Sequence, residues 1–131
     1  MSTGNRFQKG LIRRRQVLGD EYVNNAIHRE DAFNSPIQKT LTENIWSDIW
    51  TRDDITLRER SLITVSFLIA LNRPHELRLH LNAARRNGCS LKDLRELVLQ
   101  ASVYCGAPAA VDATKHINEI FADDIAAWSE D

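Results

Sequence analysis

The sequence has few of the residues that cross-link or interrupt a chain. Its 131 residues include two cysteines, three prolines and five glycines. Because Cys89 and Cys105 form no CxxC pair, neither a disulfide framework nor a zinc ribbon is indicated. This cysteine usage fits a reducing cytoplasm best. Between the few glycines and prolines the apolar residues recur with helical spacing, which leaves little room for strands and predicts an all-α fold.

The chain also lacks an excess of charge and a long hydrophobic run. Seventeen basic and 18 acidic residues give a net charge of −1, so no overall electrostatic attraction to nucleic acid or to a membrane is expected. The most apolar stretch, residues 62–71, carries Thr64 and Ser66 and is too short to span a bilayer. The N-terminus shows no charged start followed by an apolar run. We therefore expect a cytoplasmic protein with a single domain over residues 1–131.

Local signals place the helices along the chain. Ser35 and Pro36 suit an N-cap followed by a first-turn proline, and Gly19 and Gly88 suit helix ends. The predicted helices cover residues of about 5–18, a short segment from 20, 35–50, 61–71, 74–87, 90–104 and 107–127. The helix over residues 61–71 is expected to run through the core with no solvent-exposed face.

A cation, a carboxylate and an imidazole meet at the start of one predicted helix. Glu76 and His80 are four residues apart and share a helical face, and Arg73 lies at the N-terminal end of that face. In isolation such a cluster is also typical of a solvated helix cap. His75 lies five residues from His80, about 140° away around the axis. The HExxH spacing of zinc proteases is therefore not met, and we expect no metal site here.

Several separated blocks resemble one family. They are Arg58-Glu59-Arg60-Ser61-Leu62, Arg73-Pro74-His75-Glu76-Leu77, His80, Asn87-Gly88 and Tyr104-Cys105-Gly106-Ala107-Pro108-Ala109-Ala110. In this order and spacing they resemble the 4-carboxymuconolactone decarboxylase family over residues of about 6–121. The resemblance implies an all-α bundle of about six or seven helices of the alkylhydroperoxidase D-like superfamily, which assembles as a homotrimer or a hexamer.

The resemblance also implies a function. It is the cofactor-free decarboxylation of 4-carboxymuconolactone, a dicarboxylate lactone, in the protocatechuate branch of the β-ketoadipate pathway. Two alternatives stay open at this point. The chain could act on another lactone, a quinone-like or a polyketide-derived acid, because one fold hosts several chemistries. It could also be a non-catalytic oligomeric partner that kept the scaffold.

Peroxidase relatives in the superfamily carry two cysteines and a glutamate on the same face. If His80 matches their histidine, Arg73 and Glu76 replace the cysteines and Ser61 replaces the glutamate. Disulfide cycling is therefore excluded at this site, and a peroxidase assay is expected to be blank. Anion-binding and acid–base groups take the place of the thiols.

The resemblance and the helix geometry together assign roles. His80 is the leading donor of a proton or of a hydrogen bond to an oxyanion, with Glu76 orienting it and holding it protonated. Arg73 is expected to bind a substrate carboxylate, with Arg60 as a second candidate. Trp46 and Tyr104 are candidate substrate contacts. Trp46 and Trp50 are four residues apart, a spacing that more often marks a buried helical face than a substrate wall.

Other conspicuous residues are interpreted as structural. Three successive arginines, at positions 13–15, fan over about 200° of a helix and form no single nucleic-acid stripe. We expect them at the surface or in salt bridges between subunits. Cys105 is expected to be a packed thiol beside a turn, and His28 and His116 to be surface residues.

Overall fold

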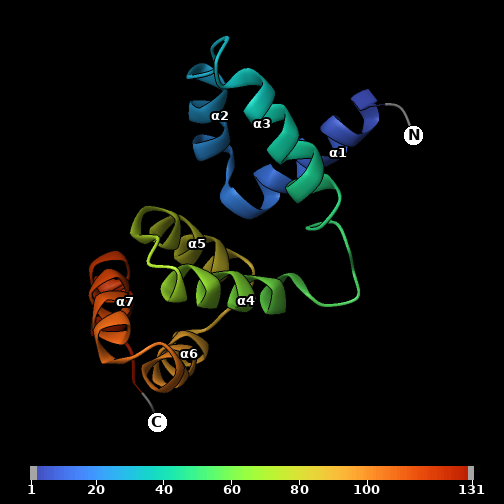
Figure 1. Cartoon of the computed structure of the whole chain (residues 1–131). Coiled ribbons are helices and arrows are strands. Elements are labelled where there is room, and N and C mark those ends of the chain that lie inside the picture. The colour runs from blue at the N-terminus through green and yellow to red at the C-terminus, as the bar shows by residue number, and fades with distance from the viewer. Residues whose placement is uncertain (1–2, 130–131) are drawn as a thin grey trace. The chain divides into compact units, whose positions relative to one another are not determined.

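The structure is a computed structural model that describes residues 3–129 (Figure 1). This part of the chain forms helices and contains no strand, so the all-α prediction is confirmed. The elements are α1 (Thr3–Leu18), α2 (Asp20–His28), α3 (Ser35–Leu41), the π-helix η1 (Thr42–Ser47), α4 (Leu57–Ala70), α5 (Pro74–Arg86), α6 (Leu91–Tyr104), α7 (Ala107–Ile120) and α8 (Ala122–Ala126).

The chain divides into two compact units, Met1–Leu57 and Arg58–Asp131. The first contains α1, α2, α3 and η1, and the second contains nearly all of α4 together with α5 to α8. Each unit has its own contacts and is described separately. One domain over residues 1–131 stays a prediction.

In the first unit, α1 packs closely against η1. Gly10 lies at the crossing, and a Cβ atom there would clash with the carbonyl oxygen of Thr42 and lie 3.1 Å from the amide nitrogen of Ser47. The absence of a side chain at Gly10 therefore allows the two backbones to approach each other. Gly19, with φ of 90°, ends α1 as expected from the sequence.

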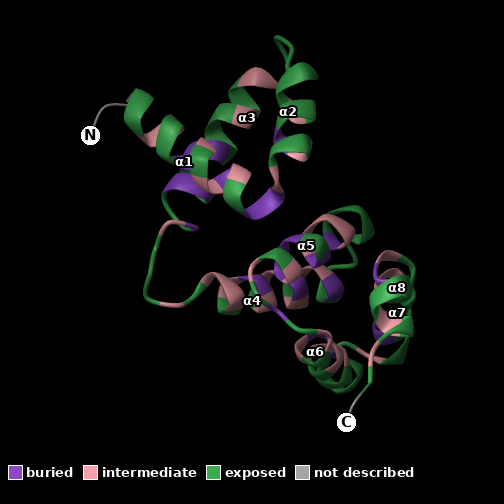
Figure 2. Ribbon diagram, turned by 180° about the vertical axis from the view of Figure 1, so that it is seen from behind, coloured by how far each residue is buried: buried purple, intermediate pink, exposed green. Residues whose placement is uncertain are grey.

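The predicted helix over residues 35–50 changes type along its length. It begins at Ser35 with Asn34 as N-cap, one residue before the expected cap, and passes from α3 into η1 at Thr42. Trp46 and Trp50 are buried and stacked, with 5.2 Å between ring centroids, so the expected burial of the aromatic end is confirmed. In contrast, α3 carries no buried residue (Figure 2).

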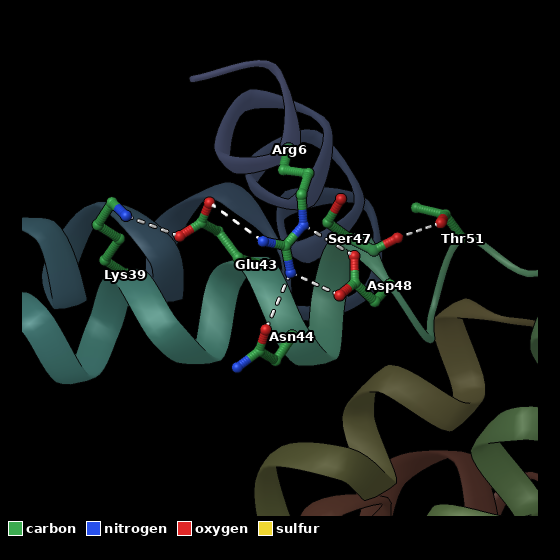
Figure 3. Close-up of polar contacts among 7 residues, drawn as sticks. All are labelled: Arg6, Lys39, Glu43, Asn44, Ser47, Asp48 and Thr51. Atoms are coloured by element: carbon green, nitrogen blue, oxygen red, sulfur yellow. Dashed lines mark hydrogen bonds and ion pairs between the residues drawn. The ribbon is translucent and has the colours of Figure 1, made fainter. Parts of the chain in front are cut away.

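A polar cluster joins α1 to η1 (Figure 3). Arg6 donates hydrogen bonds to the carboxylate of Asp48 at 2.5 and 3.1 Å and to Asn44 at 2.9 Å. The buried carboxylate of Glu43 lies 3.7 Å from Arg6 and 2.9 Å from Lys39. The hydrogen bond from Arg6 lowers the pKa of Asp48. These contacts compensate the charge of Glu43 and fix the position of α1 on η1.

The second unit has a continuous apolar core from α4, α5, α6 and α7. Its buried residues are Val65, Ile69, Leu77, Leu81, Ala84, Cys89, Leu94, Ala101, Ala113 and Phe121. Local signals set several helix ends here. Gly88, with φ of 99°, ends α5 as predicted, with Cys89 N–H bonded to the Ala84 carbonyl at 2.9 Å. Ser90 and Asp93 form a capping box at the start of α6, where the sequence predicts a helix from residue 90.

Two helices of this unit differ from the sequence prediction. The expectation that residues 61–71 have no solvent-exposed face is wrong, because Phe67 and Leu71 are each 62% exposed and Ile63 is 44% exposed. The last helix is not continuous to Ala127, because Phe121, with ψ of 31°, separates α7 from α8. The side chain of Phe121 at this break is buried in the core.

Two single-residue predictions also need correction. Arg14 is buried rather than at the surface, and this burial lowers its pKa, while the nearby Tyr22 acts in the opposite direction. Cys105 is exposed rather than packed, whereas Cys89 is buried. Among residues 3–129 no helix is both long and apolar enough to cross a bilayer.

Candidate functional site

The three residues predicted to carry the chemistry lie on the first half of α5. The turn before this helix is tight, because Asn72 adopts a left-handed conformation with φ of 55° and Arg73 N–H bonds to the Leu68 carbonyl at 3.0 Å. Arg73 is the N-cap, Glu76 lies in the first turn, and His80 follows one turn later. Arg73 and Glu76 are exposed, whereas His80 is half-buried.

The environment of His80 decides its charge. Burial lowers the pKa of this imidazole from 6.5 to about 4. Burial therefore favours the neutral ring at neutral pH, and this effect opposes the expectation that Glu76 holds the ring protonated. A neutral imidazole still carries one N–H and can donate a hydrogen bond to a developing oxyanion without delivering its own charge.

Arg73 lies in the wall of a cavity of about 440 Å³ between α4, α5 and α7. We call it the basic cavity, because its basic side chains are Arg73, Lys115 and His116 and its single carboxylate is Asp112. Its apolar wall comes from Leu68, Ile69, Leu77, Ala109 and Ala113. The cavity thus offers cations at one part of its wall and an apolar surface at another.

His116 was expected at the surface, but it is half-buried and bonded to a neighbour. Arg78 on α5 approaches His116 Nδ1 at 3.0 Å and donates to Glu119 at 2.9 Å. Because a guanidinium can only donate, Nδ1 must accept, and the neutral ring then carries its proton on Nε2. The contact therefore fixes the tautomer of a residue in the wall of the basic cavity.

A second cavity, of about 500 Å³, lies between α4 and α6. We call it the acidic cavity, because its ionisable carboxylates are Asp93 and Glu96. Tyr104 lies in its wall and is 82% exposed, and Cys105 lines both cavities. The structure therefore places Tyr104 and Arg73 in different cavities that meet at Cys105.

The remaining predicted residues lie elsewhere. Arg60 is half-buried in the first turn of α4, next to Ser61, which is fully buried and accepts a hydrogen bond from Asn87 Nδ2 at 2.9 Å. Trp46 belongs to the first unit and is 7% exposed. Arg73, Glu76 and His80 thus lie at the start and in the first half of one helix, but of these three only Arg73 lines either of the two cavities, and Arg60, Trp46 and Tyr104 come from other elements.

Sequence reasoning missed Lys115 and His116. A signal was present, because Ala109, Ala113 and His116 recur at spacings of four and three residues and so share one face of α7. Only the tertiary structure shows which helices pack against that face. Within residues 3–129, the histidines, cysteines and carboxylates form no group of three that could hold a metal ion.

Comparisons with known proteins show which family the chain belongs to. Residues 36–119 match the model of the carboxymuconolactone decarboxylase family. The chain is 37% identical to a 4-carboxymuconolactone decarboxylase from Acinetobacter baylyi, over 94% of this chain and 92% of that protein. It is also 39% identical to a nitrosuccinic acid decarboxylase from Metarhizium robertsii, over 82% of this chain and 75% of that protein. The chain therefore belongs to the carboxymuconolactone decarboxylase family.

Proposed function

We propose that the protein decarboxylates 4-carboxymuconolactone to 3-oxoadipate enol-lactone without a cofactor, in the protocatechuate branch of the β-ketoadipate pathway. The observation that carries the proposal is the 37% identity, over nearly the full length of both chains, to a 4-carboxymuconolactone decarboxylase. The proposal places the protein in the cytoplasm as a homotrimer or a hexamer, acting on a small dicarboxylate lactone and not on nucleic acid or membranes.

The chemistry of this substrate explains why side chains suffice. The bond between the ring carbon and its carboxylate breaks, and carbon dioxide leaves. The electron pair spreads through the ring double bond onto the lactone carbonyl and forms a dienolate, which then takes a proton on carbon. Since the lactone is the electron sink, the protein has to bind two carboxylates, stabilise the oxyanion and exclude water.

The α5 residues fit these tasks. His80, neutral in its half-buried position, donates a hydrogen bond to the lactone oxyanion, and Glu76 orients the ring from one turn earlier. Arg73 binds a substrate carboxylate from the wall of the basic cavity. Arg60, Trp46 and Tyr104 are proposed as further substrate contacts.

The test is a turnover assay on purified protein, in which the ultraviolet change of 4-carboxymuconolactone and the release of carbon dioxide are followed together. Turnover at ordinary enzyme rates supports the proposal. His80→Phe and Arg73→Met are each expected to lower kcat/KM on the order of 10²-fold, since each removes one donor that stabilises negative charge. Arg86→Met removes the same charge at the opposite end of α5 and should have little effect. A change within about threefold for both His80→Phe and Arg73→Met would contradict the assigned roles.

Nitrosuccinate is the second candidate substrate, because the chain is 39% identical to a nitrosuccinic acid decarboxylase. It too is a small dicarboxylate, and its nitro group can accept the electron pair that decarboxylation leaves. The same carbon dioxide assay with nitrosuccinate and with other lactone acids discriminates between these substrates. Inactivity on the whole panel would favour a non-catalytic oligomeric partner, and thiol-dependent peroxide reduction would contradict the replacement of the cysteines.

A further inference from the structure

The geometry points to the basic cavity as the binding site for the substrate carboxylate that remains on the product, held by Arg73, Lys115 and the Nε2–H of His116. This inference rests on the proposed function and extends it, because it names two substrate-binding residues and separates the roles of the two carboxylates. In the proposed substrate the carboxylate that remains is the acetate arm.

The charges of the two cavities favour this choice. The acidic cavity presents Asp93 and Glu96, and Asp93 is already paired with Arg58 at 2.6 Å. A dianion entering it would meet further negative charge. The basic cavity presents the basic side chains of Arg73 and Lys115 against the single carboxylate of Asp112. Because unlike charges attract, an organic anion is more stable in the basic cavity than in the acidic cavity.

His116 adds a directed donor to these cations. Its Nδ1 accepts from Arg78 at 3.0 Å, so Nε2 carries the proton in the neutral ring. Glu119 lies 2.9 Å from the same Arg78 nitrogen and helps to hold the guanidinium in place. A tautomer that is fixed before binding costs little to order when the carboxylate arrives. Arg78 is thus a positioning residue for His116.

The type of carboxylate follows from the chemistry of decarboxylation. A carboxylate that pairs with cations is stabilised in the ground state, and this stabilisation is lost as neutral carbon dioxide forms. Tight pairing of the leaving carboxylate would therefore slow the reaction. The carboxylate that keeps its charge throughout is the one that cations can hold without this cost. The apolar wall of Leu68, Ile69 and Leu77 then lies beside the rest of the substrate.

The kinetic test uses Lys115→Met, with Lys92→Met on α6 as the matched control. Lys92 is exposed, and its removal deletes the same charge outside either cavity. Loss of a contact to a carboxylate that does not react should raise KM about tenfold and leave kcat within about threefold. His116→Phe should act in the same direction. Asp112→Asn should lower KM, because it removes the one negative charge in the cavity wall.

A binding measurement separates this inference from the proposed function. Adipate, a flexible dicarboxylate that cannot react, is titrated into the wild type and each variant by calorimetry. If adipate binds more weakly to Lys115→Met and His116→Phe than to Lys92→Met, the basic cavity is supported as the carboxylate-binding site, even if the wild type does not turn over the lactone. Equal adipate affinities and equal KM values for Lys115→Met and Lys92→Met would overturn the inference. So would a wild type that does not bind adipate.

Discussion

The neutral state of His80 predicts how stability depends on pH. Burial lowers the pKa of His80 from 6.5 to about 4 in the folded chain. At about 1.4 kcal/mol per pKa unit, this difference corresponds to about 3 kcal/mol. Between pH 6.5 and about 4, His80 binds a proton in the unfolded chain but not in the folded chain. The free energy of unfolding should therefore fall by about 3 kcal/mol as the pH drops from 6.5 to about 4, and this group should contribute no further change below that.

The assay is urea denaturation at a series of pH values, with the wild type compared with His80→Gln. The variant has no titrating group at this position, so its stability should depend less steeply on pH across this range. His75→Gln is the matched control, because His75 is an exposed histidine on the same helix, and this variant should keep the slope of the wild type. An NMR titration of the histidine ring protons measures the pKa of His80 directly.

The same property predicts the activity profile. Because His80 keeps its neutral form, kcat/KM should show no loss attributable to this residue until the pH approaches about 4. A His80 ring that titrates near 6.5, or a His80→Gln variant with the pH slope of the wild type, would refute the reasoning. Glu76 would then be the group that sets the charge of His80.

Two further predictions concern stability. Gly10→Ala should cost about 3 kcal/mol, measured by urea denaturation, because the added Cβ meets the Thr42 carbonyl; Gly4→Ala, with open space around it, should be nearly neutral. Asp93→Asn should cost about 2 kcal/mol, because it weakens the capping box of α6 and the ion pair with Arg58. The hydrogen bonds from Arg58 and Ser90 lower the pKa of Asp93 from 3.8 to about 2. Thermal melts should therefore show that the stabilisation of the fold by Asp93 is lost as the pH falls from 3.8 towards 2. Unchanged stability of Gly10→Ala or Asp93→Asn would contradict the packing and capping described here.

Part of the candidate site could be predicted from the sequence, and part could not. Arg73, Glu76 and His80 could be grouped from sequence, because they lie on one helix and a regular helix fixes their relative directions. Lys115 and His116 come from α7, about 35 to 43 residues later, and no local pattern places them beside Arg73. The charge of His80 also depends on burial, which arises from the packing of other helices around α5.

The sequence by itself determined the all-α class and the ends of α5 and α6. Pro74, Gly88 and Ser90 act through their own backbone angles and nearest hydrogen bonds, which distant residues do not alter. Only the tertiary structure decided which faces are covered. Trp46, on the π-helical segment η1, lies in the interior, and the break at Phe121 ends α7. Burial depends on contacts between elements distant in sequence, so periodicity predicts an apolar face without specifying what covers it.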